Sequence, residues 1–152
     1  PLHALLKILF PNLCPRAAEH VRYRVVDRDT GAQRLRAALD RVGIALVQMV
    51  TPVTPDARLK MLCEASQGFV YAVTMTGTTG KSVAVPDTVV DYLRAVRAAS
   101  SVPVCAGFGI RAREQVEKLR GHVEGVVVGS ALVEVLERGE DAAAFLRGLR
   151  AG

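Results

Sequence analysis

The sequence has no tryptophan and few other aromatic residues, with four phenylalanines and three tyrosines among 152 residues. Its 20 lysines and arginines exceed its 15 acidic residues, which gives a net charge of +5, but they form no continuous basic block. Nucleic-acid sites usually combine clustered basic side chains with aromatic rings that stack on bases. We therefore expect an ordinary charged surface, and a charge-based site for nucleic acid or another anion is the less favoured alternative.

Long apolar runs are also absent, since no stretch approaches the roughly 18 apolar residues that suggest a transmembrane helix. Cysteine is scarce: Cys14, Cys63 and Cys105 are odd in number and widely spaced, and no paired cysteine or histidine spacing of a metal site occurs. We expect packed, reduced thiols, as in a cytoplasmic protein. The missing spacing predicts that no metal is bound, and the missing apolar run predicts no membrane partner.

The chain begins with Pro1 in place of Met, and its first ten residues lack the basic front and small-residue cleavage site of a signal peptide. This start is compatible with processing, trimming or excision from a longer protein. Half of the residues are hydrophobic and 23% are charged, a globular composition. The length and composition favour one domain over residues 1–152.

Apolar strands alternate with helical patterns along most of the chain. A strict alternation of this kind implies a parallel sheet with right-handed crossovers, either a doubly wound sheet or part of a (βα) barrel. The strands are expected at residues 23–27, 44–50, 69–73, 102–106 and 125–128.

Turn and cap residues mark the expected helices. Residues 29–31 (Asp-Thr-Gly) predict a turn and a helix cap, and Gly43 predicts the end of the following helix. Thr54 and Pro55 are expected as the N-cap and first residue of the next helix. The buried face of the first helix is expected to contain Leu35, Ala38, Leu39 and Val42. Further helices are expected after Pro86, over residues 111–120 and 131–137, and from Ala142 to the end.

Three successive strands run into glycine loops. The segments are YAVTMTGTTG (71–80), VPVCAGFGI (102–110) and GVVVGSALV (125–133). Glycine permits positive φ angles and close approach, so such loops can turn backbone N–H groups toward an anion. The three loops together predict one phosphate site at three strand ends.

The order of these loops favours the barrel. A doubly wound nucleotide fold concentrates its phosphate loop after its first strand. In (βα)8 barrels, the phosphate site is commonly built by the loops after strands 7 and 8 and a short extra helix. Here the glycines follow the last three strands, and Gly129-Ser130 opens a short helix. We therefore expect an α/β fold, a partial TIM barrel of about five parallel βα units.

Four sequence segments, taken together and in order, are similar to one family. They are LRAALDRVGIALVQMVTP (35–52) followed by TPDAR (54–58), GFVY (68–71) with TGTTG (76–80), GFGI (107–110) and GVVVGSA (125–131). Between about Leu35 and Gly148 the chain resembles the alpha subunit of tryptophan synthase. A histidine- or thiamine-pathway barrel is a weaker alternative, because the GFGI and TGTTG pair argues against it.

This resemblance implies a TIM-barrel lyase that cleaves indole-3-glycerol phosphate to indole and glyceraldehyde 3-phosphate in tryptophan biosynthesis. In the family, indole passes to a beta subunit that contains pyridoxal phosphate, so no cofactor is implied for this chain. The resemblance places Tyr71 near the reacting centre and Phe108 beside the substrate. Thr79 matches a loop threonine that helps to close the site. Gly80, Gly107, Gly109, Gly129 and Ser130 match the phosphate-binding residues.

The family's general acid and base are a Glu at the end of strand 2 and an Asp in the following loop, within the first third of a barrel of roughly 250 residues. No segment here resembles strands 1 to 3, so the five strands correspond to strands 4 to 8. Residues 1–30 diverge from the family. The Pro-Asp-Leu-Pro of its strand 4 is absent, and Asp27 matches its Asp only loosely.

We therefore expect a truncated or divergent lyase that binds phosphate and is inactive alone. The alternative is a non-catalytic half-barrel that binds a phosphate ester or another subunit. Because an open parallel sheet has unpaired edges, we expect self-association that completes a barrel, or a rearranged compact sheet. The resemblance implies a beta subunit as the other possible protein partner.

Overall fold

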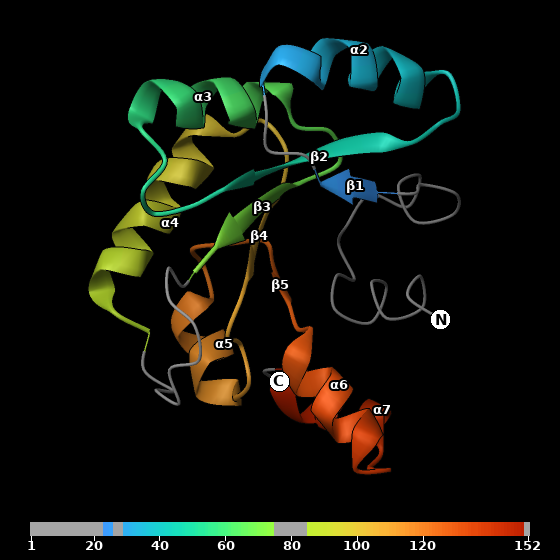
Figure 1. The fold of residues 1–152 in the computed structure, drawn as a ribbon. Helices are drawn as coiled ribbons and strands as arrows, with labels where there is room; N and C mark the ends of the chain where they lie inside the picture. Colours follow the sequence, from blue (N-terminus) through green and yellow to red (C-terminus); the bar gives the residue numbers. More distant parts are fainter. Residues whose placement is uncertain (1–22, 26–28, 75–84, 151–152) are drawn as a thin grey trace.

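The computed structural model describes the backbone of residues 23–25 and 29–33, and backbone and side chains of residues 34–74 and 85–150. Strands and helices alternate along this part of the chain (Figure 1). In order they are β1 (Tyr23–Val25), α2 (Asp29–Asp40), β2 (Ala45–Val50), α3 (Asp56–Ala65), β3 (Val70–Val73), α4 (Asp87–Ala99), β4 (Val104–Gly107), α5 (Arg113–Leu119), β5 (Gly125–Val127), α6 (Ser130–Glu137) and α7 (Ala142–Leu149). None of the helices in these ranges combines the length and apolarity needed to cross a bilayer.

The five strands form one parallel sheet in sequence order, from β1 to β5. This confirms the predicted α/β alternation and the predicted parallel sheet. In the register, Tyr71 lies beside Cys105, and Val73 lies beside Gly107. β4 starts two residues later than predicted, at Val104, because Pro103 has no N–H to donate to the sheet.

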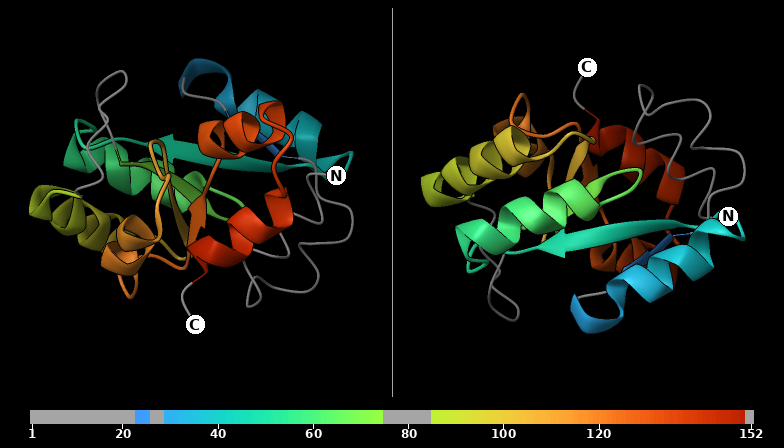
Figure 2. Two further views of the ribbon diagram at one scale, coloured as in Figure 1. Left: turned by 90° about the horizontal axis from the view of Figure 1, so that it is seen from below. Right: turned by 90° about the horizontal axis from the view of Figure 1, so that it is seen from above.

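One face of the sheet is covered by helices. Alternate strand residues, among them Val70, Ala72, Val104 and Ala106, join one buried cluster with apolar residues of α3 to α7. The views from above and below show α3 and α4 lying side by side against the strands (Figure 2). The near-continuous apolar strands follow from this burial, because the intervening residues are also largely buried on the opposite face.

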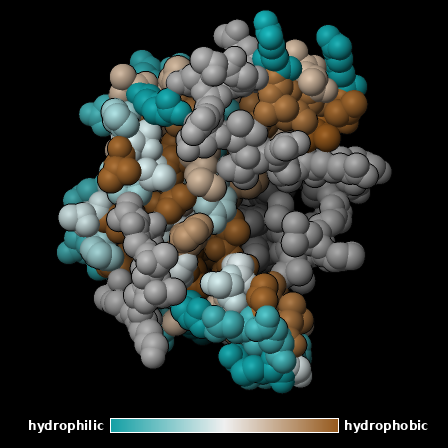
Figure 3. All heavy atoms as spheres, in the orientation of Figure 1, coloured by the Kyte–Doolittle hydropathy of each residue, from teal (hydrophilic) through white to brown (hydrophobic). Residues whose placement is uncertain are grey.

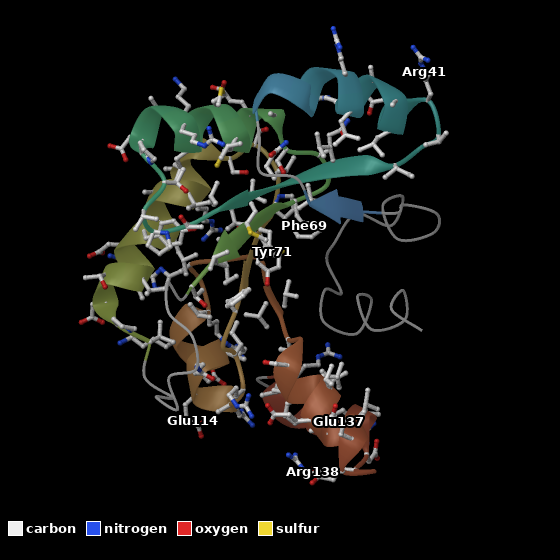
Figure 4. All side chains as sticks on the ribbon, viewed as in Figure 1. Arg41, Phe69, Tyr71, Glu114, Glu137 and Arg138 are labelled. Atoms are coloured by element: carbon white, nitrogen blue, oxygen red, sulfur yellow. The ribbon has the colours of Figure 1, made fainter. Side chains whose placement is uncertain are left out.

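The opposite face carries a second, smaller cluster. Val47, Phe69 and Cys105 are buried there, with Tyr71 and Val127 packed against them. Figure 4 shows Phe69 and Tyr71 on the same side of the sheet, as expected for residues two apart along a strand. Hydrophobic residues gather over the strands in the centre of this view, while hydrophilic residues dominate over α6 and α7 (Figure 3).

The amino-terminal edge of the sheet is tied by polar side chains. Gln67 Oε1 accepts a hydrogen bond from the Leu46 N–H (2.8 Å), and Ser66 Oγ accepts one from the Gln48 N–H (3.0 Å). Glu124 Oε2 accepts one from the Val104 N–H (2.8 Å). These bonds satisfy backbone N–H groups of β2 and β4 with side chains from the loops that enter the next strand.

Three helix predictions were wrong in detail. Residues 29–31 are the first turn of α2 and not a turn before it. Val42 is 67% exposed and not buried, because α2 ends at Asp40 and the chain then turns at Gly43, whose φ is +66°. Ala38 is also exposed, which leaves Leu39 as the buried residue of the predicted face.

Thr54 is not the N-cap of α3. Pro55 occupies that position, one residue later than predicted. The Thr54 hydroxyl instead accepts a hydrogen bond from the Thr51 N–H at 2.9 Å, closing the preceding turn. A threonine before a proline can close its own turn in this way, since its side-chain oxygen competes for nearby backbone donors.

Candidate functional site

The second and third glycine loops leave neighbouring parallel strands, so they lie at the same, carboxyl-terminal edge of the sheet. Gly107 is the last residue of β4, and Phe108 and Gly109 follow it directly. At the third loop, Gly129 is the N-cap of α6 and Ser130 is its first residue. This is the arrangement that the sequence pattern predicted for these two loops.

Two of the predicted site residues, Thr79 and Gly80, lie outside the described residues, as does Asp27. Of the first glycine segment, the structure therefore describes only the part that leads into the loop, from Tyr71 in β3 to Thr74.

The loop after β4 has an unusual backbone. Phe108 and Gly109 both have φ angles of +79°, and Phe108 is the one non-glycine residue with positive φ in the described ranges. A bulky side chain in this region costs about 1–3 kcal/mol. The Phe108 side chain is nevertheless 59% exposed, so packing of its ring does not explain the conformation. The bonds that hold it come from Thr74 and Gln115.

Thr74, directly after β3, binds the start of this loop. Its backbone N–H donates to the Gly107 carbonyl at 2.9 Å. Its hydroxyl lies 2.8 Å from the same carbonyl and 2.7 Å from the Phe108 carbonyl. Since a threonine hydroxyl has one proton, the two carbonyls share it. Thr74 is 8% exposed, so these bonds are largely shielded from water.

Gln115, in α5, binds the end of the loop. Its Nε2 donates to the Gly109 carbonyl at 3.0 Å. Its Oε1 accepts from the N–H groups of Arg111 (2.8 Å) and Ala112 (3.0 Å). The side chain is 5% exposed. One buried amide therefore fixes both the loop and the start of α5.

Tyr71 reaches from β3 toward the loop after β4. A Cβ atom placed on Gly107 would lie 2.2 Å from the Tyr71 hydroxyl oxygen. The tyrosine side chain thus occupies the space that a side chain at position 107 would need. Burial, and to a smaller degree Cys105, raises the pKa of the Tyr71 hydroxyl above its ordinary value.

The third loop leads into the first turn of α6. The first N–H groups of a helix have no intrahelical acceptor and carry the positive end of its dipole. Gly129 and Ser130 are both exposed, and a Cβ on Gly129 would meet no atom within 4 Å. The start of α6 is therefore accessible to an anion of the size of a phosphate.

An ion pair joins the residue after the second loop to helix α6. The Arg111 guanidinium binds Glu134 of α6 through two hydrogen bonds, one from Nη1 to Oε1 (2.9 Å) and one from Nη2 to Oε2. Hydrogen bonding to Arg111 lowers the pKa of Glu134. This pair compensates the charge that Arg111 would otherwise add near the loops.

No group of three His, Cys, Asp or Glu side chains in the described part of the chain is arranged to hold a metal ion. The sequence did not predict the roles of Thr74 and Gln115. The signals available in the sequence were a polar residue at the end of an apolar strand, and a glutamine next to the apolar Val116 near the start of a helix.

The chain is similar in sequence to proteins of one family. The family model for the tryptophan synthase alpha chain matches residues 25–149. The alpha chain of Geobacillus kaustophilus is 45% identical over 104 residues, which are 68% of this chain and 38% of the relative. The alpha chain of Streptomyces avermitilis is 39% identical over 116 residues, or 76% of this chain and 42% of the relative.

Solved structures give the same result. A tryptophan synthase alpha subunit of Pyrococcus furiosus superposes with a TM-score of 0.70 at 34% identity, over 88% of this chain and 56% of that one. A structure described for the α2β2 complex of the same organism gives 0.72 at 36% identity, over 84% and 54%. The chain thus spans about half the length or less of these relatives, and it corresponds to a C-terminal part of a TIM barrel.

Proposed function

Because the chain belongs to the family of tryptophan synthase alpha chains, we propose that it forms the phosphate-binding part of a lyase of tryptophan biosynthesis. The reaction is cleavage of indole-3-glycerol phosphate to indole and glyceraldehyde 3-phosphate. The chain's role is to bind the phosphate of this substrate, in the reducing environment of the cytoplasm.

The observation that supports this proposal best is the Gly107–Gly109 loop. Its left-handed residues are held by buried side chains and lie at the same sheet edge as the exposed start of α6. A strained loop of this kind persists only where surrounding contacts impose it, and such loops cluster at binding sites. Backbone N–H groups and a helix N-terminus are the groups that bind phosphate in many proteins.

The proposed roles of the individual residues follow the family resemblance. Gly80, Gly107, Gly109, Gly129 and Ser130 bind the phosphate. Phe108 contacts the substrate with its exposed ring, and Thr79 closes the site. Tyr71 lies beside the reacting part of the substrate, where its protonated hydroxyl can donate a hydrogen bond.

We propose that the chain alone does not complete the reaction. Cleavage needs a proton for indole C3 and removal of a proton from the glycerol hydroxyl, and the family's acid and base belong to a part of the barrel to which no segment here corresponds. Pyridoxal phosphate belongs to the beta subunit in this proposal, and the chain itself needs no cofactor.

A beta-type subunit is the proposed partner. One of the similar solved structures is that of the tryptophan synthase α2β2 complex of Pyrococcus furiosus. Two apolar side chains of α6, Val133 and Leu136, are 52% and 58% exposed and are available for a protein contact. Self-association of the chain is the competing mode, and light scattering of the chain with and without a beta subunit distinguishes them.

Titration with glycerol 3-phosphate and with indole-3-glycerol phosphate, followed by calorimetry, tests the proposal. Saturable binding that inorganic phosphate competes away is expected. Ser130→Asp places a negative charge at the start of α6 and should abolish binding. Ser101→Asp is the matched control, because Ser101 is exposed and precedes β4 at the opposite edge.

Absence of binding at millimolar ligand would reject the phosphate site. Indole release by the chain alone would instead reject the claim that the acid and base are missing. Binding without indole release by the chain alone agrees with this proposal and with the second candidate function, a non-catalytic half-barrel that binds phosphate esters. Indole release after addition of the N-terminal part of a family alpha chain would favour the lyase, and its absence would favour the non-catalytic half-barrel.

A further inference from the structure

All three carbonyl groups of the Gly107–Gly109 loop are held by two buried side chains. The carbonyls of Gly107 and Phe108 accept from the Thr74 hydroxyl, and that of Gly109 accepts from Gln115 Nε2. The two side chains come from different elements, one from the end of β3 and one from α5. Two unrelated elements therefore fix consecutive peptide groups of one loop.

The orientation of these carbonyls determines the orientation of the amides. In a planar trans peptide the N–H points opposite to the C=O, and the described peptide bonds are trans. The N–H groups of Phe108 and Gly109 therefore point away from Thr74, and that of Ile110 points away from Gln115. Within the described residues, no acceptor is recorded for these three N–H groups.

We propose that Thr74 and Gln115 are the positioning residues of this phosphate loop. They act through the backbone: by binding the three carbonyls they present the N–H groups of residues 108–110 to the phosphate of the ligand. Neither side chain touches the ligand. This inference rests on the proposed function, because it assigns a role within the same site.

The strain at Phe108 supports this assignment. A positive φ at a phenylalanine has to be compensated by surrounding contacts, and the Phe108 side chain is mostly exposed. The hydroxyl bond to the Phe108 carbonyl and the amide bond to the next carbonyl are the contacts that flank this residue. Removing either should let the loop relax to negative φ and turn the N–H groups away from the ligand.

The test compares the full wild-type chain with four variants, using glycerol 3-phosphate as the probe. Thr74→Val keeps the shape of the side chain and removes the hydroxyl, and Thr74→Ser keeps the hydroxyl. Gln115→Leu removes the amide. Ser66→Ala is the matched control, since it removes a buried hydroxyl that also binds a carbonyl, that of Phe69 at 2.6 Å, at the opposite edge of the sheet.

Dissociation constants are measured by calorimetry, and the φ angle of Phe108 is monitored without ligand through NMR couplings. Thr74→Val and Gln115→Leu are each expected to weaken binding about tenfold, the typical effect of one lost hydrogen bond. Thr74→Ser should bind like the wild type, and so should Ser66→Ala. The couplings of Phe108 should change in Thr74→Val and remain unchanged in Ser66→Ala.

Wild-type affinity in both Thr74→Val and Gln115→Leu would overturn the inference, and so would an equal loss in Ser66→Ala, which would indicate general destabilisation. If the wild-type chain binds no phosphate ester, the proposed function fails by itself. The couplings then decide the positioning role: a changed φ at Phe108 in Thr74→Val supports it, and an unchanged φ overturns it.

Discussion

The hydroxyl oxygen of Tyr71 lies over Gly107, 2.2 Å from the position that a Cβ atom on that residue would take. Tyr71 pairs with Cys105 in the sheet, and Gly107 is two residues further along β4. The tyrosine therefore leans toward the carboxyl-terminal edge and fills a space left by the absence of a side chain. A glycine is required here by this contact and not by its φ angle.

Gly107→Ala should destabilise the chain, because the added methyl group cannot coexist with the tyrosine ring in its present position. Overpacking of this kind costs about 1–3 kcal/mol, which urea unfolding would measure. Gly148→Ala is the matched control: no atom lies within 4 Å of its Cβ position, and it lies in α7, where alanine should stabilise by about 0.5–1 kcal/mol.

A double-mutant cycle identifies the cause. Tyr71→Ala removes the ring, so the loss caused by Gly107→Ala should be smaller in that background. Equal losses in both backgrounds would show that the methyl group clashes with something other than Tyr71.

Tyr92→Phe should stabilise the chain. The Tyr92 hydroxyl is buried without a hydrogen-bond partner in the described part of the chain, while the residue packs against the main hydrophobic cluster. Removing an unsatisfied hydroxyl should raise the free energy of unfolding by about 1 kcal/mol. Tyr92→Leu, which also removes the ring packing, should lower it. A less stable phenylalanine variant would contradict the assignment of an unsatisfied hydroxyl.

Alkaline pH should destabilise the fold through Cys105. Burial, with a smaller contribution from Glu124, raises the pKa of this thiol from 9.0 to about 12. Between these values the unfolded chain loses the proton and the folded chain keeps it, so stability is complete below pH 9 and falls as the pH rises toward 12. The free energy of unfolding, measured at several pH values from 7 to 10.5, should therefore fall more steeply in the wild type than in Cys105→Ala. Parallel curves would show that the thiol titrates normally in the fold.

Glu134→Gln should strengthen phosphate binding at low ionic strength. The substitution removes the α6 carboxylate that compensates Arg111, the residue directly after the second glycine loop, and leaves the guanidinium free to attract an anion. Glu140→Gln is the matched control, because Glu140 pairs with Arg138 after the end of α6. The gain should largely disappear at about 0.5 M salt, where charges are screened beyond a few ångströms. An equal gain in both variants would point to net charge alone.

The strand order was predictable from the sequence because each apolar run is bounded by turn residues. β2 and β3 are buried on both faces, so their sequences differ from those of surface helices. Helix starts were less predictable. Residues 29–31 form the first turn of α2 although Gly31 favours a turn, and the Thr54 hydroxyl binds the preceding turn and does not cap α3.

The candidate site was predictable in part. The glycines at 107, 109 and 129 identified the loops, because glycine permits backbone conformations and close approaches that other residues do not. The functions of Thr74 and Gln115 were not predictable, because each depends on contacts with a different element; Thr74 binds residues more than 30 positions away. The positive φ of Phe108 was not predictable either, because phenylalanine normally avoids that conformation.

Polar side chains hold the amino-terminal edge of the sheet, namely Gln67, Ser66 and Glu124. This affects how the loops of the fold can be altered. They secure the strands at the end remote from the glycine loops, so the two ends can vary separately. Loops at the carboxyl-terminal edge could be lengthened, shortened or exchanged for those of another barrel while the strands keep their register. The sheet is therefore a scaffold that should keep its strand register when the loops at its carboxyl-terminal edge are changed.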